Sequence, residues 1–284
     1  MLSSWVIDEA VQRALAEDVG KGDLTSNALI PEDAYTEGVI YSKDSGVLAG
    51  MPVARRVFER LDPEVEIEQE LEDGSALAPG SVIARIRGKG RAILTGERTA
   101  LNFLQRLSGI ATATADLVKI IEGTGASLVD TRKTTPGLRL LEKYAVRIGG
   151  GCNHRLGLDD GVLIKDNHIK AAGGIAEAVR RAKKQAPHTI KIEVEVESIE
   201  QLYEALDVGA DIIMLDNMSP SQMQEAVRLT AGRVPLEASG GINRETIREV
   251  AETGVDLISV GAVTHSARAL DISLDIGEMK KFSR

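Results

Sequence analysis

The spacing of the hydrophobic positions changes near residue 127. Before that point, apolar residues recur at helical intervals in residues 5–17 and 51–61, whereas residues 36–43, 65–68 and 81–87 have the short alternating pattern of strands. This front part is rich in strands and does not alternate them regularly with helices. The pattern predicts a separate N-terminal α+β domain with a sandwich-like arrangement.

A long helical stretch, residues 90–121, follows this domain, and Ser108-Gly109 predicts a break in it. From residue 127 onward, short apolar strands alternate with helices. The strands are expected at residues 127–130, 162–165, 190–195, 211–215, 235–238 and 256–260, and the helices at 137–147, 173–186, 198–207, 219–231 and 243–253. A further strand at 145–150 is possible, although glycines weaken its pattern. We therefore predict α/β architecture with an incomplete parallel barrel of six or seven strands. The expected domains are residues 1–110 and 111–284.

Cationic side chains follow the early strands of this predicted barrel. They are Arg132, Lys133, Arg155 and Lys165. Catalytic residues of β/α barrels lie at the carboxyl ends of the strands, and a guanidinium group can bind a carboxylate through two hydrogen bonds. The set therefore favours a substrate with several anionic groups. The alternative is that each is an ordinary surface ion-pair residue.

Carboxylates and histidines supply other candidate chemistry. Glu195 and Asp216 end consecutive strands and could hold Mg²⁺ or ribose hydroxyls, or could form structural pairs with lysines. Glu193 points to the same side of its strand as Glu195, so either could be the ligand, and Glu195 lies nearer the strand end. His154 and His168 could act as acids, bases or hydrogen-bond donors. No spacing typical of a zinc site is present.

Glycine turns follow the last strands. Ser239, Gly240 and Gly241 follow one strand, and Val260, Gly261 and Ala262 follow the next. Backbone N–H groups in such turns hold phosphate in many barrels, although tight turns also need glycine for their conformation alone.

Composition narrows the classes of partner. The 284 residues carry a net charge of -9 and only 3% aromatic residues, which argues against a nucleic-acid surface. A cationic cleft in an acidic protein suits a small anion. No long apolar run predicts a membrane span. The chain has one cysteine and begins without a charged-then-apolar leader, and both features favour the cytoplasm.

Several motifs resemble the quinolinate phosphoribosyltransferase family, also called nicotinate-nucleotide pyrophosphorylase (carboxylating). They are Glu97–Asn102, Asp130–Thr134, Gly151–Arg155, Leu163–His168, Glu193–Glu195, Met214–Met218, Glu237–Ile242 and Val260–Ala262. The similarity runs from the loop at Glu17-Asp18 almost to the C-terminus. It implies an N-terminal domain on an incomplete barrel. It also implies a reaction in de novo NAD biosynthesis, in which quinolinate and 5-phosphoribosyl 1-pyrophosphate (PRPP) give nicotinate mononucleotide, pyrophosphate and CO₂ with Mg²⁺. The working unit implied is a homodimer with shared active sites.

The resemblance also implies residue roles. Quinolinate would contact Arg132, His154, Arg155 and Lys165, together with Arg98 of the partner chain. Thr131 and Lys133 belong to the same motif, and Lys133 would lie near both a carboxylate and the pyrophosphate. Glu195 and Asp216 would serve the ribose and the metal. The turns at 239–241 and 260–262 would hold the 5-phosphate.

Other functions remain open at the level of sequence. A barrel lyase or isomerase acting on a sugar phosphate would explain the carboxylates and the glycine turns, but not so many cations. A related transferase could act on another base. A non-catalytic protein that binds a phosphorylated ligand is a further alternative.

Overall fold

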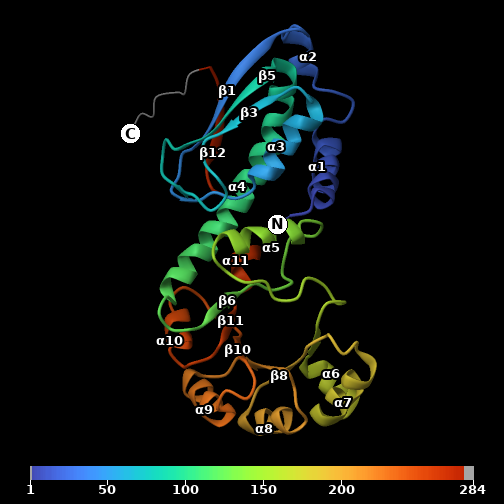
Figure 1. Ribbon diagram of the computed structural model, residues 1–284, viewed down its shortest axis with the longest axis vertical. Helices are drawn as coiled ribbons and strands as arrows, with labels where there is room; N and C mark the ends of the chain where they lie inside the picture. The colour runs from blue at the N-terminus through green and yellow to red at the C-terminus, as the bar shows by residue number, and fades with distance from the viewer. Residues whose placement is uncertain (1, 278–284) are drawn as a thin grey trace. The chain divides into compact units, whose positions relative to one another are not determined.

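The computed structural model describes residues 2–277 (Figure 1). Contacts divide the chain into two compact units. The first contains Met1–Ala115, Thr135–Gly150 and Ser266–Arg284 as far as they are described, and the second contains Asp116–Thr134 and Gly151–His265. The sequence predicted one domain boundary, at residue 110, whereas each of these units consists of more than one separate segment of the chain. Among the described residues, no helix is long and apolar enough to cross a membrane.

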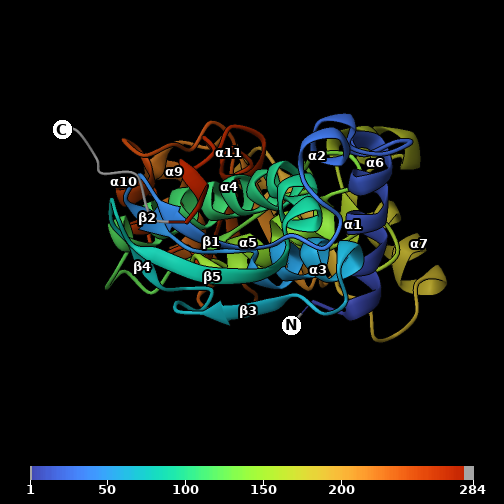
Figure 2. The same cartoon turned by 90° about the horizontal axis from the view of Figure 1, so that it is seen from above.

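The first unit contains a four-stranded antiparallel sheet with strand order β12-β1-β5-β3. Figure 2 shows β1, β5 and β3 side by side. Its helices are α1 (Ser4–Asp18), α2 (Leu24–Leu29), α3 (Met51–Leu61), α5 (Arg139–Ile148) and most of α4 (Gly90–Ile120). Its strands are β1 (Tyr35–Ser42), β2 (Gly46–Val47), β3 (Glu66–Gln69), β4 (Ala76–Leu77), β5 (Val82–Lys89) and β12 (Ile272–Ile276). The predicted α+β organisation of the N-terminal part is confirmed.

Strand β12 was not predicted, although its sequence has a usable signal. It pairs with β1 in antiparallel register, with Gly38 opposite Ile276 and Ile40 opposite Leu274. Ile272 and Leu274 are buried and alternate with less buried residues, which is the period-two pattern of a half-buried strand. The C-terminal segment therefore completes the sheet of the first unit.

Helix α4 is continuous, so the predicted break at Ser108-Gly109 is wrong. A Cβ atom on Gly109 would lie 2.0 Å from the carbonyl oxygen of Arg268, so glycine is required here for close packing. The Ser108 hydroxyl accepts a hydrogen bond from the Ala49 backbone N–H at 3.0 Å. Ser108 and Gly109 therefore serve tertiary packing and do not break the helix.

The second unit contains a six-stranded parallel sheet with strand order β6-β11-β10-β9-β8-β7. Figure 1 shows helices α7, α8, α9 and α10 along the outer side of its strands. The strands are β6 (Ser127–Val129), β7 (Val162–Ile164), β8 (Ile192–Val196), β9 (Ile212–Asp216), β10 (Leu236–Ser239) and β11 (Leu257–Ser259). The helices are α6 (Asp166–Ala172), α7 (Ile175–Gln185), α8 (Ile199–Asp207), α9 (Pro220–Thr230), α10 (Ile247–Ala251) and α11 (Ala262–His265). Because β6 and β7 are the edge strands, the sheet does not close within residues 2–277, which confirms the predicted incomplete barrel.

The possible strand at residues 145–150 is wrong. Those residues fall largely in helix α5, whose buried face includes Leu141, Ala145 and Val146. This spacing is helical, and the following glycines end the helix. Helix α10 is shorter than the predicted 243–253, because the Asn243 side chain accepts from the backbone N–H groups of Glu245 and Thr246 and forms a turn there.

Strand β8 carries side chains of opposite character on its two faces. Ile192, Val194 and Val196 alternate with Glu193 and Glu195, and all five residues are buried. Successive side chains of a strand point to opposite faces, so the two glutamates share one face. That face lines the cavities of the second unit.

Candidate active site

A polar cavity of about 590 Å³ lies at the carboxyl edge of the parallel sheet. Its walls come from the ends of β8, β9, β10 and β11 and from the segments after β6 and β7. The lining residues predicted from the sequence are Thr131, Lys133, Lys165, Glu195, Asp216, Ser239, Gly240, Gly241, Val260, Gly261 and Ala262. The structure thus brings most of the candidate residues around one cavity, as the strand-end argument predicts.

Opposite charges meet inside this cavity. The Lys165 Nζ atom lies 2.9 Å from Glu195 Oε2. The lysine side chain is half exposed, whereas that of Glu195 is 10% exposed. Lys165 therefore offsets the charge of a buried carboxylate.

Glu195 and Asp216 carry oxygen donors of the kind that Mg²⁺ prefers. Both carboxylates line the same cavity, and each uses one oxygen within the chain, with Lys165 and with Asn217 respectively. Hard oxygen ligands of this kind bind Mg²⁺ together with substrate phosphates and water.

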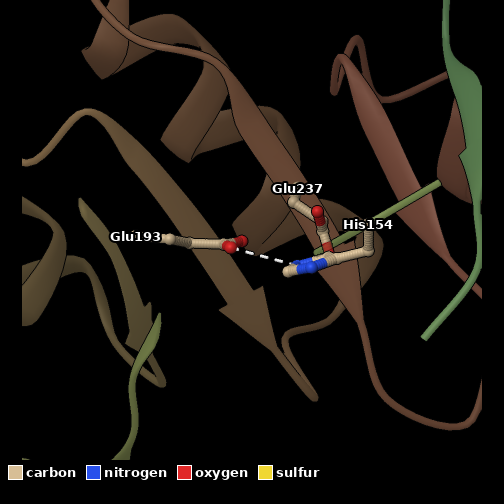
Figure 3. A group of neighbouring side chains, drawn as sticks. All are labelled: His154, Glu193 and Glu237. Atoms are coloured by element: carbon tan, nitrogen blue, oxygen red, sulfur yellow. Dashed lines mark ion pairs between the residues drawn. The ribbon is translucent and has the colours of Figure 1, made fainter. Parts of the chain in front are cut away.

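A second cavity, of about 270 Å³, contains a buried cluster of His154, Glu193 and Glu237 (Figure 3). The His154 Nε2 atom lies 3.0 Å from Glu193 Oε2 and 3.7 Å from Glu237 Oε1. Its Nδ1 atom accepts a hydrogen bond from the Arg155 backbone N–H at 2.7 Å. Both ring nitrogens of His154 are therefore engaged within the chain.

This arrangement does not suit a metal, although the donor atoms lie within 4.8 Å of one another. A backbone N–H can only donate, so Nδ1 of His154 must carry no proton. The neutral ring then has its proton on Nε2, the atom that faces the glutamates. A metal on Nε2 would require the other tautomer and the loss of the Arg155 hydrogen bond.

The Glu237 carboxyl group has a raised pKa in its buried surroundings. Burial, and next the charge of Glu193, raise its pKa from 4.5 to about 7. One oxygen of each glutamate is buried without a hydrogen-bond partner. Protonation of Glu237 reduces the repulsion between its carboxyl group and that of Glu193.

Replacing Glu237 by glutamine should change the pH dependence of stability. A carboxyl whose pKa is raised on folding stabilises the native state below its unfolded pKa, and this contribution is lost as the pH rises through the folded pKa. When the pH rises from 5 to 8, wild type should therefore lose about 2–3 kcal/mol of unfolding free energy that Glu237→Gln does not lose. Urea unfolding of both proteins at pH 5 and at pH 8 measures this difference in stability.

Glu225→Gln provides a control whose pH dependence should lie below the range of pH 5 to 8. The hydrogen bond and charge of Arg228 lower the pKa of Glu225, which lies on the surface of α9. Its stabilising contribution is present at high pH and lost as the pH falls through its folded pKa. An unchanged pH dependence in Glu237→Gln would contradict a raised pKa of Glu237 in the native state.

The other predicted cations, Arg155, Arg132 and Arg98, do not line the carboxyl-edge cavity. Arg155 lines the second cavity and donates from Nη1 to the Gly161 carbonyl at 2.9 Å. Burial, and next the positive charge of Arg132, lower the pKa of Arg155, so the two guanidinium groups are close enough to repel. Arg132 is exposed and lines neither cavity. Arg98 is exposed on α4 in the first unit.

Some residues of the site were not predicted. Asp130, which is fully buried, accepts hydrogen bonds from Asn153 Nδ2 at 2.7 Å and the His154 backbone N–H at 2.9 Å. It therefore fixes the segment that carries Arg155. Its position directly after β6 was a signal, but its partners are distant in sequence. Asn217 and His265 also line the carboxyl-edge cavity.

Comparison with known proteins adds family evidence to this geometry. Residues 110–275 match the model of the quinolinate phosphoribosyl transferase C-terminal domain, and residues 23–108 match that of the N-terminal domain. A probable nicotinate-nucleotide pyrophosphorylase [carboxylating] from Bacillus subtilis is 48% identical over 92% of this chain and 90% of its own length. The solved structure of NadC from Streptococcus pyogenes has a TM-score of 0.95 at 44% identity and covers 99% of both chains. The nicotinate-nucleotide pyrophosphorylase from Francisella tularensis gives 0.94 at 44% identity and covers 98% of both.

The fold and the cavities define a parallel α/β protein with a charged binding site at the carboxyl edge of its sheet. The family models together span most of the chain, and relatives share well over a third of its residues along nearly their whole length. The chain belongs to the quinolinate phosphoribosyl transferase family.

Proposed function

We propose that this protein transfers the phosphoribosyl group of PRPP to quinolinate with loss of CO₂. The products are nicotinate mononucleotide and pyrophosphate, and the step belongs to de novo NAD biosynthesis. The observation that carries the proposal is the cavity that gathers Lys133, Glu195, Asp216 and both glycine turns at one edge of the sheet. Family membership agrees with it.

The side chains suit a mechanism that depends on positioning and charge. The pyridine nitrogen of quinolinate attacks the sugar carbon as pyrophosphate leaves, so no protein nucleophile is needed. Backbone N–H groups of the turns at 239–241 and 260–262 would hold the 5-phosphate. The Lys133 side chain passes close to Gly261, since a Cβ there would lie 3.0 Å from Lys133 Cδ. Lys133 would stabilise the leaving pyrophosphate from that place.

Mg²⁺, when bound, would offset charge on the pyrophosphate. Glu195 and Asp216 would hold this ion, directly or through water, and would contact the ribose. Lys165 would turn from Glu195 toward a quinolinate carboxylate. Arg132 and Arg155 would bind the carboxylates, and His154 would hold Arg155 in place through the backbone hydrogen bond.

We further propose that the working unit is a homodimer in the cytoplasm, in which Arg98 of one chain completes the quinolinate site of the other. The exposure of Arg98 is compatible with such a role. The proposal otherwise rests on the resemblance of the Glu97–Asn102 motif to the family.

One assay tests the function. The purified protein is given PRPP, Mg²⁺ and quinolinate labelled with ¹⁴C in the carboxyl next to the ring nitrogen. We expect release of pyrophosphate and ¹⁴CO₂ in equal amounts. A sugar-phosphate lyase or isomerase would release neither, and a non-catalytic binding protein would bind PRPP without turnover; each of these results would exclude the transferase.

Asp216→Asn should impair the use of PRPP and Mg²⁺ more than the binding of quinolinate. The change keeps the shape of the side chain but removes the negative charge that suits a hard cation. We expect kcat/KM for PRPP to fall by about 10²-fold or more, as is common when a group that stabilises a charged transition state is lost. Calorimetry with Mg²⁺ present would show whether PRPP affinity falls as well. Unchanged affinity together with unchanged turnover would remove Asp216 from the mechanism.

A further inference from the structure

Asn217 has an unusual backbone conformation at the edge of the carboxyl-edge cavity. It follows Asp216 at the end of β9 and has a φ of +53°. Among the described non-glycine residues, only Ala231, with a φ of +50°, shares this left-handed conformation. Asparagine tolerates it better than most residues but still at some cost in free energy. Conformations of this kind persist where surrounding contacts impose them.

The contacts of Asn217 connect neighbouring strand ends. Its side-chain Nδ2 donates to Asp216 Oδ2 at 2.7 Å, and its backbone N–H donates to the Ser239 carbonyl at 2.9 Å. A Cβ on Gly240 would lie 2.2 Å from Asn217 Oδ1, so the amide packs directly against the glycine turn. One residue therefore touches both the carboxylate that ends β9 and the turn that ends β10.

We propose that Asn217 is a positioning residue that holds Asp216 and the Ser239–Gly240 turn in one arrangement, so that the ribose and 5-phosphate of PRPP are bound as a unit. This inference rests on the proposed function of the cavity. The left-handed backbone aims the amide back at Asp216, and the hydrogen bond fixes which oxygen of that carboxylate faces the cavity. The absence of a side chain at Gly240 leaves the space that the amide fills.

The chemistry of the amide explains why asparagine suits this position. Its NH₂ group can donate to a carboxylate, which an aspartate at the same place could not do at neutral pH. An aspartate would also place a second negative charge beside Asp216. A glycine would adopt the backbone conformation without strain but would supply no hydrogen bond.

Asn217→Gly and Ala231→Gly make a matched pair of variants. Both relieve a left-handed conformation, so both should keep the native fold, which thermal unfolding checks. Only Asn217→Gly removes contacts to the proposed site. We expect its KM for PRPP to rise about tenfold or more, the usual effect of losing a hydrogen bond to a charged group. The KM for quinolinate should stay within about twofold, and Ala231→Gly should match wild type in both constants.

Calorimetry with PRPP and Mg²⁺ separates this inference from the proposed function. If wild-type protein binds PRPP but does not turn over quinolinate, the proposed reaction fails, while the affinity of Asn217→Gly still decides the inference. Asn217→Asp should bind PRPP no better than Asn217→Gly, because it replaces the donor by a carboxylate. The affinity for inorganic phosphate alone should fall less than the affinity for PRPP, because phosphate would occupy only the Ser239–Gly240 turn and would not reach Asp216. Equal PRPP affinity in wild type and Asn217→Gly, or equal loss for PRPP and quinolinate, would overturn the positioning role.

Discussion

Nicotinate should be nearly inert in place of quinolinate, with kcat/KM lower by about 10²–10⁴-fold, equivalent to several kcal/mol. The physical reason lies in the cations that the structure places together. Arg155 is partly buried, and the neighbouring charge of Arg132 already lowers its pKa. Two carboxylates offset this repulsion, whereas a single carboxylate leaves the charge of the partly buried Arg155 less fully neutralised.

Pyrophosphate release with each base, at saturating PRPP and Mg²⁺, measures this selectivity. Arg132→Ala should narrow the ratio, because it removes one of the two cations proposed to bind the carboxylates. Arg244→Ala is a suitable control: this exposed arginine pairs with Asp116 and lines neither cavity. Comparable turnover of nicotinate and quinolinate by the wild-type protein would show that the cations do not select a dicarboxylate.

The gathering of candidate residues at the carboxyl edge of the sheet could be predicted from the sequence, because the end of each strand has a local sequence signal. Each short apolar run ends on a polar residue or a glycine, and parallel strands bring these ends together. The alternation of Glu193 and Glu195 also predicts that they share a face. It does not predict their separate partners, since Glu193 faces His154 whereas Glu195 meets Lys165. Those partners depend on where the segments that carry His154 and Lys165 lie along β8, and the sequence does not give that position.

The parts that could not be predicted depend on contacts between distant segments. The role of His154 changes once its ring is seen between the Arg155 backbone and the buried glutamates. Gly109 has the local signal of a break but serves a close approach to Arg268. The link from Asn217 to Gly240 could not be predicted from the sequence, because it exists only when β9 and β10 lie side by side.

Arg98→Ala and Lys165→Ala should each be nearly inactive as pure dimers, yet a mixture of the two should regain activity. Arg98 is exposed on α4, so its removal should leave the fold intact. Lys165 is the half-exposed partner of Glu195 in the cavity of the second unit. If Arg98 completes the site of the partner chain, a heterodimer has one site with both lesions and one site with neither.

The size of the recovery follows from the symmetry of the proposed dimer. Random exchange gives about half heterodimers, each with one intact site of two, so roughly a quarter of wild-type activity should return. Differently tagged chains allow the heterodimer to be isolated and exchange to be verified. Lys119→Ala removes another exposed cation of the same helix and should remain fully active. Isolated heterodimers that stay inactive would mean that Arg98 acts within its own chain or supports folding, and the shared-site model would be wrong.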